Sequence, residues 1–286
     1  MTDLTARVCA AGLAAGLAAV GVAAAEPFEG TRAHLLERRA RGLHAGMQFT
    51  YRRPERSADP TAALPGARAL VVGARAYDAG TPAPPPGVAV GRVARYAATD
   101  TMAPLVTSLG AVADVLRAAG WRTRVLADDN ALVDREAARR AGIGFYGKST
   151  NLLLPGRGSW FVLGAVLTDA PLTATARAAT AAGEGARAAG GEDHDGCGAC
   201  TRCLDGCPTG AIVAPGVVDA RRCLAWLLQQ HGTFPRAHRR ALADRIYGCD
   251  DCQEVCPPNH GARRGEPASV DGVGGPGRWV PLVELL

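Results

Sequence analysis

Eight of the nine cysteines of this 286-residue chain lie in its second half, and their spacing constrains the fold more than any other feature. The first four read C-x2-C-x2-C-x3-C-P and the last three read C-x2-C-x3-C-P, with one cysteine between the two runs. Runs of this kind hold iron–sulfur clusters through their thiolates. The eight residues are Cys197, Cys200, Cys203, Cys207, Cys223, Cys249, Cys252 and Cys256.

The runs also predict how the cysteines are shared. In two-cluster iron–sulfur domains the fourth cysteine of the first run binds the other cluster. Pro208 and Pro257 follow the crossing cysteines and stop the local backbone there. Applied here, the rule gives four ligands to each of two 4Fe–4S clusters. The first takes Cys197, Cys200, Cys203 and Cys256, and the second takes Cys207, Cys223, Cys249 and Cys252.

Other uses of cysteine fit this pattern less well. Zinc ribbons also contain Cys-x-x-Cys pairs, but the first run is not a zinc spacing. A disulfide framework requires a secreted chain. Clusters carry one electron at a time, so we predict a reductase or an electron relay. Cys9, far from the others in an apolar stretch, is predicted to be an inert buried thiol.

The amino-terminal region needs a decision between two readings. Residues 10–25 are small and apolar and end in Ala-Ala-Ala-Glu, as in a signal peptide. Against this, Arg7 is the one basic residue before the run, Asp3 offsets it, and the run is too short for a membrane span. We favour a helix followed by a short strand at Val20. Cluster thiolates also favour the reducing cytoplasm.

Apolar patterning before the cysteines predicts a mixed α/β (α+β) domain. Strands are expected at 67–76, 121–126 and 159–169, and helices through 105–116 and at 131–141. We predict the following divisions of the chain: a first domain at 1–172, a flexible Ala/Gly-rich linker at 173–193, a two-cluster ferredoxin-like domain at 194–262, and a tail at 263–286.

The segment GIGFYGKSTN contains the only lysine of the chain, Lys148, among 32 basic residues. The net charge of +5 says little about partners. A single lysine in an arginine-rich chain indicates a place where arginine does not serve, although chance remains an alternative. Asn151 lies in the same segment, between two predicted strands, where α/β folds place ligands.

Several motifs in order resemble the epoxyqueuosine reductase family. They are ADDNALVDREAARRAGIGFYGKSTNLL, GSWFVLGAVLTD, CGACTRCLDGCPTGAI, DARRCLAW and RIYGCDDCQEVCPPN, and the resemblance runs from about residue 36 to residue 259. It implies a cobalamin-binding domain, related to reductive dehalogenases and nitroreductases, followed by a ferredoxin-like domain with two 4Fe–4S clusters. The implied activity is reduction of epoxyqueuosine to queuosine at the tRNA wobble position, with electrons passing from the clusters to cobalamin.

The resemblance also assigns site residues. The family's catalytic aspartate corresponds to Asp128, six residues before the pair Asp134-Arg135, and it would donate a proton to the leaving oxygen. Without the family, Asp128 would be read as a helix cap. The other residues implied for the cobalamin pocket are Arg56, Tyr96, Lys148, Asn151, Ala225, Asp250 and Asp251. The last two could equally be turn residues near a cluster, and Lys148 and Asn151 could simply hold their loop.

The chain departs from the family in places. It has Thr99-Asp100-Thr101-Met102 where many members have Arg-Asp-Tyr-His, Phe145 in place of a frequent tryptophan, and Gln229 in place of a usual glutamate. These changes leave the cysteines intact and bear on the exact substrate.

Basic residues are concentrated between Arg221 and Arg245. This stretch contains six arginines, two histidines and a single acid, Asp244. Arginine pairs with phosphate through two parallel hydrogen bonds, so the patch indicates phosphate binding, and the resemblance to the family implies that this phosphate belongs to tRNA. A solvated helix is the plain alternative. Other hypotheses are a cobalamin reductase of a small molecule, of dehalogenase type, and a non-catalytic electron carrier. We expect a monomer, no membrane contact, and an unknown low-potential electron donor.

Overall fold

The computed structural model describes residues 3–77, 82–180, 183–184, 195–261 and 277–285. Its centre is an antiparallel sheet of order β4-β7-β2-β1-β8-β9. The two longest strands, β2 (Ala69–Ala76) and β7 (Phe161–Thr168), pair along their whole length. The other strands are β1 (Ala19–Ala24), β4 (Thr123–Ala127), β8 (Ala179–Thr180) and β9 (Gly183–Glu184).

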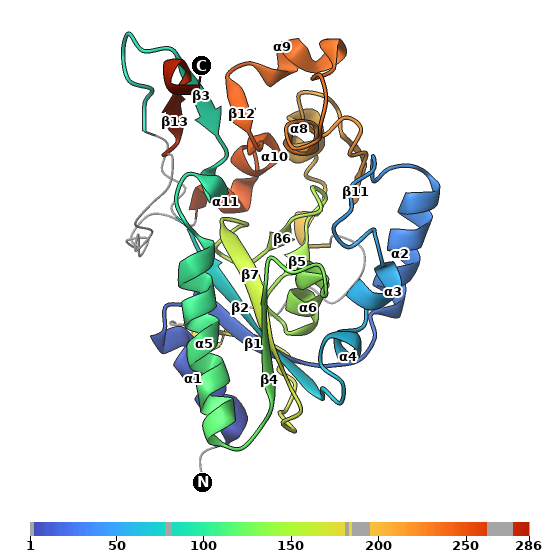
Figure 1. Cartoon of the computed structure of the whole chain (residues 1–286), viewed down its shortest axis with the longest axis vertical. Helices are drawn as coiled ribbons and strands as arrows, with labels where there is room; N and C mark the ends of the chain where they lie inside the picture. The colour runs from blue at the N-terminus through green and yellow to red at the C-terminus, as the bar shows by residue number, and fades with distance from the viewer. Residues whose placement is uncertain (1–2, 78–81, 181–182, 185–194, 262–276, 286) are drawn as a thin grey trace.

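Side chains of this sheet are buried on both faces, which is why its strands read as nearly continuous apolar runs. Helices α1 (Leu4–Ala14) and α5 (Met102–Ala118) cover one face (Figure 1). Leu109 of α5 is fully buried there. On the opposite face lies α6 (Asp134–Arg140), beside Ile143. Neighbouring strand residues alternate between these two cores, as the two-residue period of a strand requires.

Short elements connect this sheet to the cysteine-rich region. Strand β3 (Val90–Val93) is the middle strand of a small sheet, in which it pairs with β12 (Arg245–Tyr247) and β13 (Trp279–Pro281). The remaining elements of the first part are α2 (Glu29–Ala40), α3 (Pro54–Ser57), α4 (Pro60–Ala63), η1 (Arg95–Ala97), β5 (Phe145–Tyr146) and β6 (Leu152–Leu153).

The cysteine-rich region lies at the top of the view, above the sheet (Figure 1). Its helices are one to two turns long and its strands are only two or three residues long. Loops that contain the cysteines, rather than segments with periodic apolar faces, occupy most of its sequence. The elements are η2 (Asp195–Cys197), α7 (Arg202–Asp205), β10 (Ile212–Ala214), β11 (Val217–Val218), α8 (Leu224–Leu227), η3 (Arg236–His238), α9 (Arg239–Leu242), α10 (Asp251–Glu254) and α11 (Pro257–Gly261), with η4 (Leu282–Leu285) closing the described chain.

The structure confirms the expected strands at β2, β4 and β7, the helix α5, and the helix and strand of the amino-terminal region. Cys9 is buried, as predicted. The helix expected from residue 131 begins only at Asp134, after an extended Val133. No helix among the described residues has the length and apolar character needed to cross a bilayer.

The start of the segment expected to be a flexible linker is packed on the sheet. Strand β8 pairs with β1, and the Thr175 hydroxyl accepts a hydrogen bond from the Val22 backbone N–H at 2.9 Å. Ala178 is buried. Residues 173–180 therefore lie along the edge of the sheet, where Thr175 and strand β8 bond to β1. The rest of that segment, apart from residues 183–184, lies outside the described residues, as does most of the predicted tail.

Candidate active site

The fold brings the seven cysteines of the two runs and Cys223 together in two groups. Electrostatic coupling links the thiol of Cys256 to Cys197, Cys200 and Cys203, although about fifty residues separate it from them. The thiol of Cys252 is coupled in the same way to Cys249, Cys223 and Cys207. These groups match the two ligand sets that the spacing predicts. The ligand assignment itself remains a prediction.

Burial dominates the environment of these thiols. It raises the pKa of Cys249 to about 12, with a further increase from the charge of Asp251. Burial also raises the pKa of Cys256 to about 11, with increases from Cys197 and Cys203. Such thiols stay protonated at neutral pH unless a metal replaces the proton. The donor set therefore fits clusters, whose iron supplies the positive charge that thiolates need.

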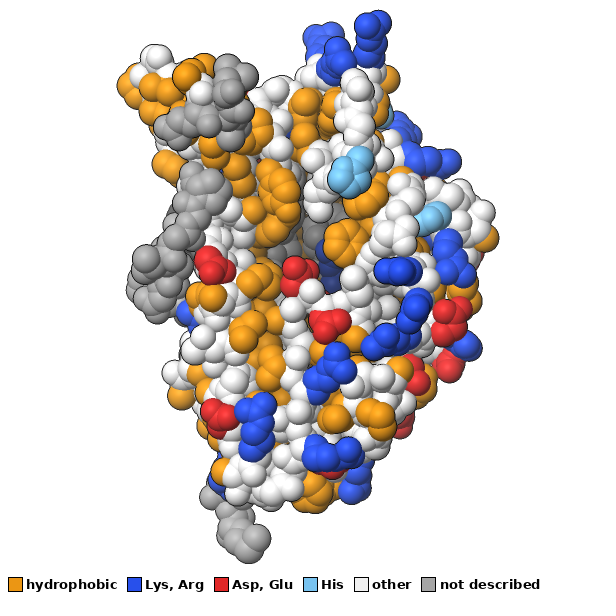
Figure 2. Space-filling view, in the orientation of Figure 1, with side chains coloured by type: hydrophobic (Ala, Val, Ile, Leu, Met, Phe, Trp, Pro, Cys, Tyr) orange, Lys and Arg blue, Asp and Glu red, His pale blue; other side chains and the backbone are white. Residues whose placement is uncertain are grey.

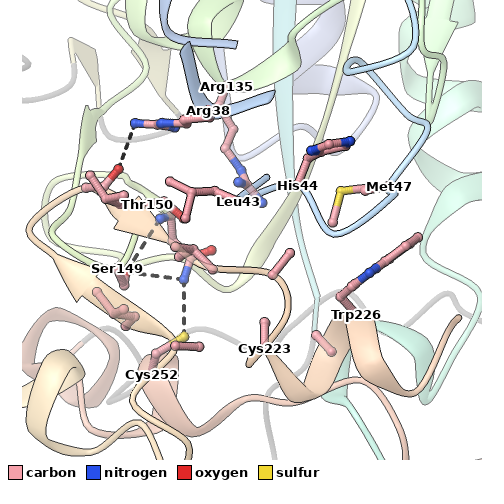
Figure 3. A pocket seen from close by; sticks show the side chains of 18 of the residues that line it. Arg38, Leu43, His44, Met47, Arg135, Ser149, Thr150, Cys223, Trp226 and Cys252 are labelled. Atoms are coloured by element: carbon pink, nitrogen blue, oxygen red, sulfur yellow. Dashed lines mark hydrogen bonds between the residues drawn. The ribbon is translucent and has the colours of Figure 1, made fainter. Parts of the chain in front are cut away.

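A cavity of about 660 Å³ lies between the sheet domain and the cysteine-rich region. Arg38 and Arg135 approach it from one side, and Cys223 and Cys252 from the other (Figure 3). Its size is typical of cofactor sites. All cysteines of the second group line it, so a cofactor bound here would sit against the second cluster. They are Cys207, Cys223, Cys249 and Cys252.

Three of the residues implied for the cobalamin pocket line this cavity: Asn151, Ala225 and Asp251. The Asn151 amide nitrogen lies 3.7 Å from the Cys252 sulfur and donates toward it. Both carboxylate oxygens of Asp251 accept hydrogen bonds from the Arg245 guanidinium, which keeps this acid paired at the cavity wall.

The other implied pocket residues do not line the cavity. Arg56 is exposed on α3. Tyr96 packs against Tyr247 with ring centroids 6.2 Å apart. Asp250 is 3% exposed and forms ion pairs with Arg95 and Arg278. Asp250 therefore fastens the cysteine loop to η1 and to the start of β13.

Lys148 also lies outside the cavity. Its ammonium group donates hydrogen bonds to the carbonyl oxygens of Gly198, at 2.7 Å, and Cys200, at 3.1 Å. Lys148 therefore contacts a loop other than its own, the one that contains the first cysteines, and its implied place in the cobalamin pocket remains a prediction.

Asp128 directly follows β4 with a backbone φ of +51°, in the left-handed region that few non-glycine residues adopt. Its side chain is exposed and does not line the cavity. The helix-cap reading is wrong, because α6 starts six residues later with Val133 as its N-cap. Asp129, not Asp128, accepts a hydrogen bond from the Ala131 backbone N–H, at 2.8 Å. Strain of this kind concentrates at functional sites.

Asp134 is a residue whose chemistry the sequence did not reveal. Burial raises the pKa of its carboxyl to about 7; the Arg135 charge lowers it, and Asp128 raises it further. One of its carboxylate oxygens has no hydrogen-bond partner among the described residues. A carboxyl that holds a proton near neutral pH therefore lies close enough to Asp128 for the two charges to interact.

The cavity wall carries a surplus of positive charge. Glu136, 4% exposed, accepts hydrogen bonds from Arg139 and Arg140, which lower the pKa of its carboxyl below the ordinary value although burial opposes this. Those two arginines are thus offset by an acid. Arg135 lines the same wall, and within the described residues it has no ion pair.

The basic stretch around α9 divides into two kinds of residue. Arg236, Arg239 and Arg240 are exposed. Basic side chains gather at the top of the molecule, where α9 lies (Figure 1 and Figure 2). Arg221 and Arg245 instead pair with acids, Asp219 and Asp251. The sequence could not separate these classes, because their acids lie elsewhere in the chain or across a turn.

Comparison with known proteins bears on these features. A family model described as a 4Fe-4S double cluster binding domain matches residues 196–259, which include the seven cysteines of the runs and Cys223. A Burkholderia pseudomallei protein named epoxyqueuosine reductase is 35% identical over 309 residues, covering 100% of this chain and 74% of that protein. This chain belongs to the epoxyqueuosine reductase family.

Solved structures agree with the family. An epoxyqueuosine reductase with a tRNA-Tyr epoxyqueuosine-modified stem loop has a TM-score of 0.86 and 29% identity, covering 99% of this chain and 72% of that chain. The reductive dehalogenase NpRdhA has a TM-score of 0.52 and 16% identity, covering 95% and 34%, and shows a shared fold alone. The predicted order of a mixed α/β region and a 4Fe–4S region is confirmed. The number of clusters and the cobalamin site remain predictions.

Proposed function

We propose that this chain reduces epoxyqueuosine to queuosine at the wobble position of tRNA. The observation that carries this proposal is the 35% identity to an epoxyqueuosine reductase over the whole chain. The likeness to a family structure with an epoxyqueuosine-modified tRNA stem loop supports the substrate. Reduction removes the epoxide oxygen as water, which takes two electrons and two protons.

We propose two 4Fe–4S clusters as the source of these electrons, one in each cysteine group. The second group lines the cavity, so electrons reaching it are delivered at the cavity wall. The first group lies next to the second, since Cys203 is electrostatically coupled to Cys252. Two clusters this close allow single electrons to pass between them. An external donor of low potential would load them.

We propose that the cavity binds cobalamin, with Asn151, Ala225 and Asp251 at its walls. Bound there, cobalamin would supply a strongly reducing, nucleophilic metal centre next to the second cysteine group. The protein's part is to orient the substrate and exclude water. Arg135, unpaired among described residues and lining the cavity, is placed to hold an anionic group of whatever enters.

We propose Asp128 as the acid that protonates the oxygen released from the epoxide. Its strained backbone at the end of β4 and its position in the family pattern support this role. Its side chain is exposed and lies outside the cavity, so this role requires either that the substrate reaches Asp128 or that its loop moves toward the cavity. Burial raises the pKa of the neighbouring Asp134 carboxyl to about 7, and this group lies close enough to Asp128 for their charges to interact.

We propose that the exposed arginines of η3 and α9 contact the tRNA backbone. Arg236, Arg239 and Arg240 have no acid partner among the described residues, so their charges are available to phosphate. The small-molecule alternative of dehalogenase type is not favoured, because that likeness extends to the fold alone. We further propose that the protein acts as a cytoplasmic monomer.

The deciding experiment is anaerobic turnover. Protein reconstituted with iron, sulfide and cobalamin, and supplied with a strong reductant, is mixed with tRNA that carries epoxyqueuosine. Mass spectrometry of the nucleoside should show loss of one oxygen that depends on cobalamin. No product from protein that holds both clusters and cobalamin would refute the proposed substrate.

Asp128→Asn tests the acid. The amide cannot donate an acidic proton, so turnover should fall by about 10²–10⁴ while iron and cobalamin content stay unchanged. Asp129→Asn is the matched control, since Asp129 is an adjacent carboxyl that serves the backbone of Ala131. Equal turnover of the Asp128 variant and wild type would remove Asp128 from the chemistry.

Cys223→Ala tests the ligand pairing. Loss of one ligand should remove or alter the second cluster and leave the first, so iron content should fall by about half. Cys9→Ala, a buried thiol outside both groups, should keep full iron. Full iron and unchanged electron paramagnetic resonance (EPR) spectra in the Cys223 variant would contradict the pairing.

A further inference from the structure

One short segment of the sheet domain contacts both cysteine groups. The Phe145 ring packs so closely on Gly196, the residue before Cys197, that a β-carbon there would lie 2.3 Å from ring carbons. Lys148 donates to the carbonyls of Gly198 and Cys200. Residues 145–151 are therefore the structural connection between the sheet domain and the first group, and Asn151 reaches the second at Cys252.

The segment is itself held in place. The Gly147 backbone N–H donates to the Asn151 carbonyl at 2.8 Å, and the Lys148 carbonyl accepts from the Gly216 N–H at 2.9 Å. Arg38 of α2 donates to the Gly216 carbonyl at 2.9 Å. These bonds fix the backbone from which the Lys148 side chain extends.

The charge of Lys148 is not neutralised by a neighbouring acid. Both groups that accept its hydrogen bonds are uncharged carbonyls, and across the described ranges Lys148 forms no ion pair. The side chain is half-buried, so solvent screens its charge less than that of a surface lysine. A full positive charge thus lies against the Cys197–Cys200 loop, at carbonyls within and next to the ligand residues.

A fixed positive charge changes how easily a nearby redox centre accepts an electron. Reduction adds one negative charge to a cluster held by thiolates, and a cation nearby stabilises that product more than the oxidised form. Net charge and hydrogen bonding are among the determinants of cluster potentials. Asn151, which reaches the second group, is neutral, so the second cluster has no equivalent cation from this segment.

We propose that Lys148 raises the reduction potential of the first cluster through its charge. This makes Lys148 a positioning and electrostatic residue rather than a cobalamin ligand. Its ammonium group places the charge at two carbonyls of the Cys197–Cys200 loop. The proposal rests on the two-cluster assignment of the proposed function.

The test compares Lys148→Gln with Lys148→Arg. Glutamine keeps amide donors for the carbonyls but removes the charge, whereas arginine keeps the charge. Both variants and wild type are reconstituted with iron and sulfide, their iron content is measured, and each cluster is titrated by EPR at set potentials. At a fixed potential, the reduced-to-oxidised ratio of the first cluster should fall at least tenfold in the glutamine variant, about 59 mV for one electron.

The arginine variant should stay close to wild type, and the second cluster should shift little in either variant. An unchanged first-cluster potential in a fully loaded glutamine variant would overturn the proposal. Loss of first-cluster iron from the glutamine variant, with full iron in the arginine variant, would also overturn it, because the charge would then serve assembly. If wild type itself lacked two distinct cluster signals, the proposed function would fail first.

Discussion

Different interactions stabilise the sheet domain and the cysteine-rich region. Both hydrophobic cores of the molecule consist of residues before position 180, on the two faces of one sheet. Within the described residues 195–261, few apolar side chains are buried, and polar side chains such as Asp250 and Asn259 are buried beside them. The difference teaches that the first region can fold by burying apolar surface, whereas we expect the second to depend on the proposed cluster ligands and on ion pairs.

Buried ion pairs also connect the cysteine-rich region to η1 and β13. Buried charges, not apolar contacts, join the cysteine loop to η1 and β13: Arg278 donates to Asp250 and to the Val93 carbonyl, and Arg95 pairs with Glu254. Buried ion pairs of this type specify one arrangement, but each is costly when a partner is lost. The two regions should therefore respond differently to the same perturbation.

The largest expected effect is that of iron removal. Chelation under reducing conditions should unfold much of the cysteine-rich region, because binding free energy of metal is folding free energy in such regions. The sheet domain should persist. Limited proteolysis should cut within residues 195–261 and leave a resistant amino-terminal fragment; equal resistance of both regions would contradict the comparison.

Leu109→Ala should destabilise the sheet domain by about 2–5 kcal/mol, because Leu109 is fully buried in the core between α5 and the sheet. Chemical denaturation followed by circular dichroism measures this loss. The control is Val106→Ala, on the exposed side of the same helix, which should cost little. Iron content should be unchanged in both, since neither side chain touches the cysteines.

Asp134→Asn should change stability only at higher pH. The folded-state pKa of about 7 lies above the ordinary value of 3.8, so the cost of charging this carboxyl grows from about pH 4 to pH 7 and then stays constant. The variant should match wild type near pH 4. Above pH 7 the variant should be more stable than wild type by about 2 kcal/mol. This is half of the free energy that the full pKa shift corresponds to, because the Asp134 side chain is only half-buried. Asp114→Asn, on the exposed face of α5, should show no change in stability with pH relative to wild type.

The smallest expected effect concerns the surface. Reversing Arg239 and Arg240 to glutamate should weaken tRNA binding about tenfold or more and flatten its dependence on salt, because fewer phosphates are neutralised. Iron content, melting temperature and sheet-domain stability should not move. The matched control reverses Arg117, which lies on α5 and pairs with Asp114. Unchanged affinity of the Arg239/Arg240 variant would place the RNA contact elsewhere.

Local sequence determined the elements with strong periodicity. Strands β2 and β7 are predictable because buried apolar runs have few other uses, and α5 because its leucines recur at helical spacing. Cysteine spacing predicted the two groups, since turn geometry fixes which thiolates can reach one cluster. Helix α6 was placed too early because Asp128 looks like a cap; the left-handed backbone at that residue is a tertiary constraint.

The tertiary structure alone decided which polar residues share an environment. The sequence suggested that Lys148 had a special role, but only the fold brings the loop at Gly198 to its ammonium group. Similarly, Asp250 and Asp251 are adjacent in sequence yet have different partners. Asp250 pairs with the buried Arg278, whereas Asp251, at the cavity wall, pairs with Arg245. The spacing of the cysteines is a local feature that can be read from the sequence. Burial and charge pairing depend on contacts between segments that are distant along the chain, and no local pattern encodes those contacts.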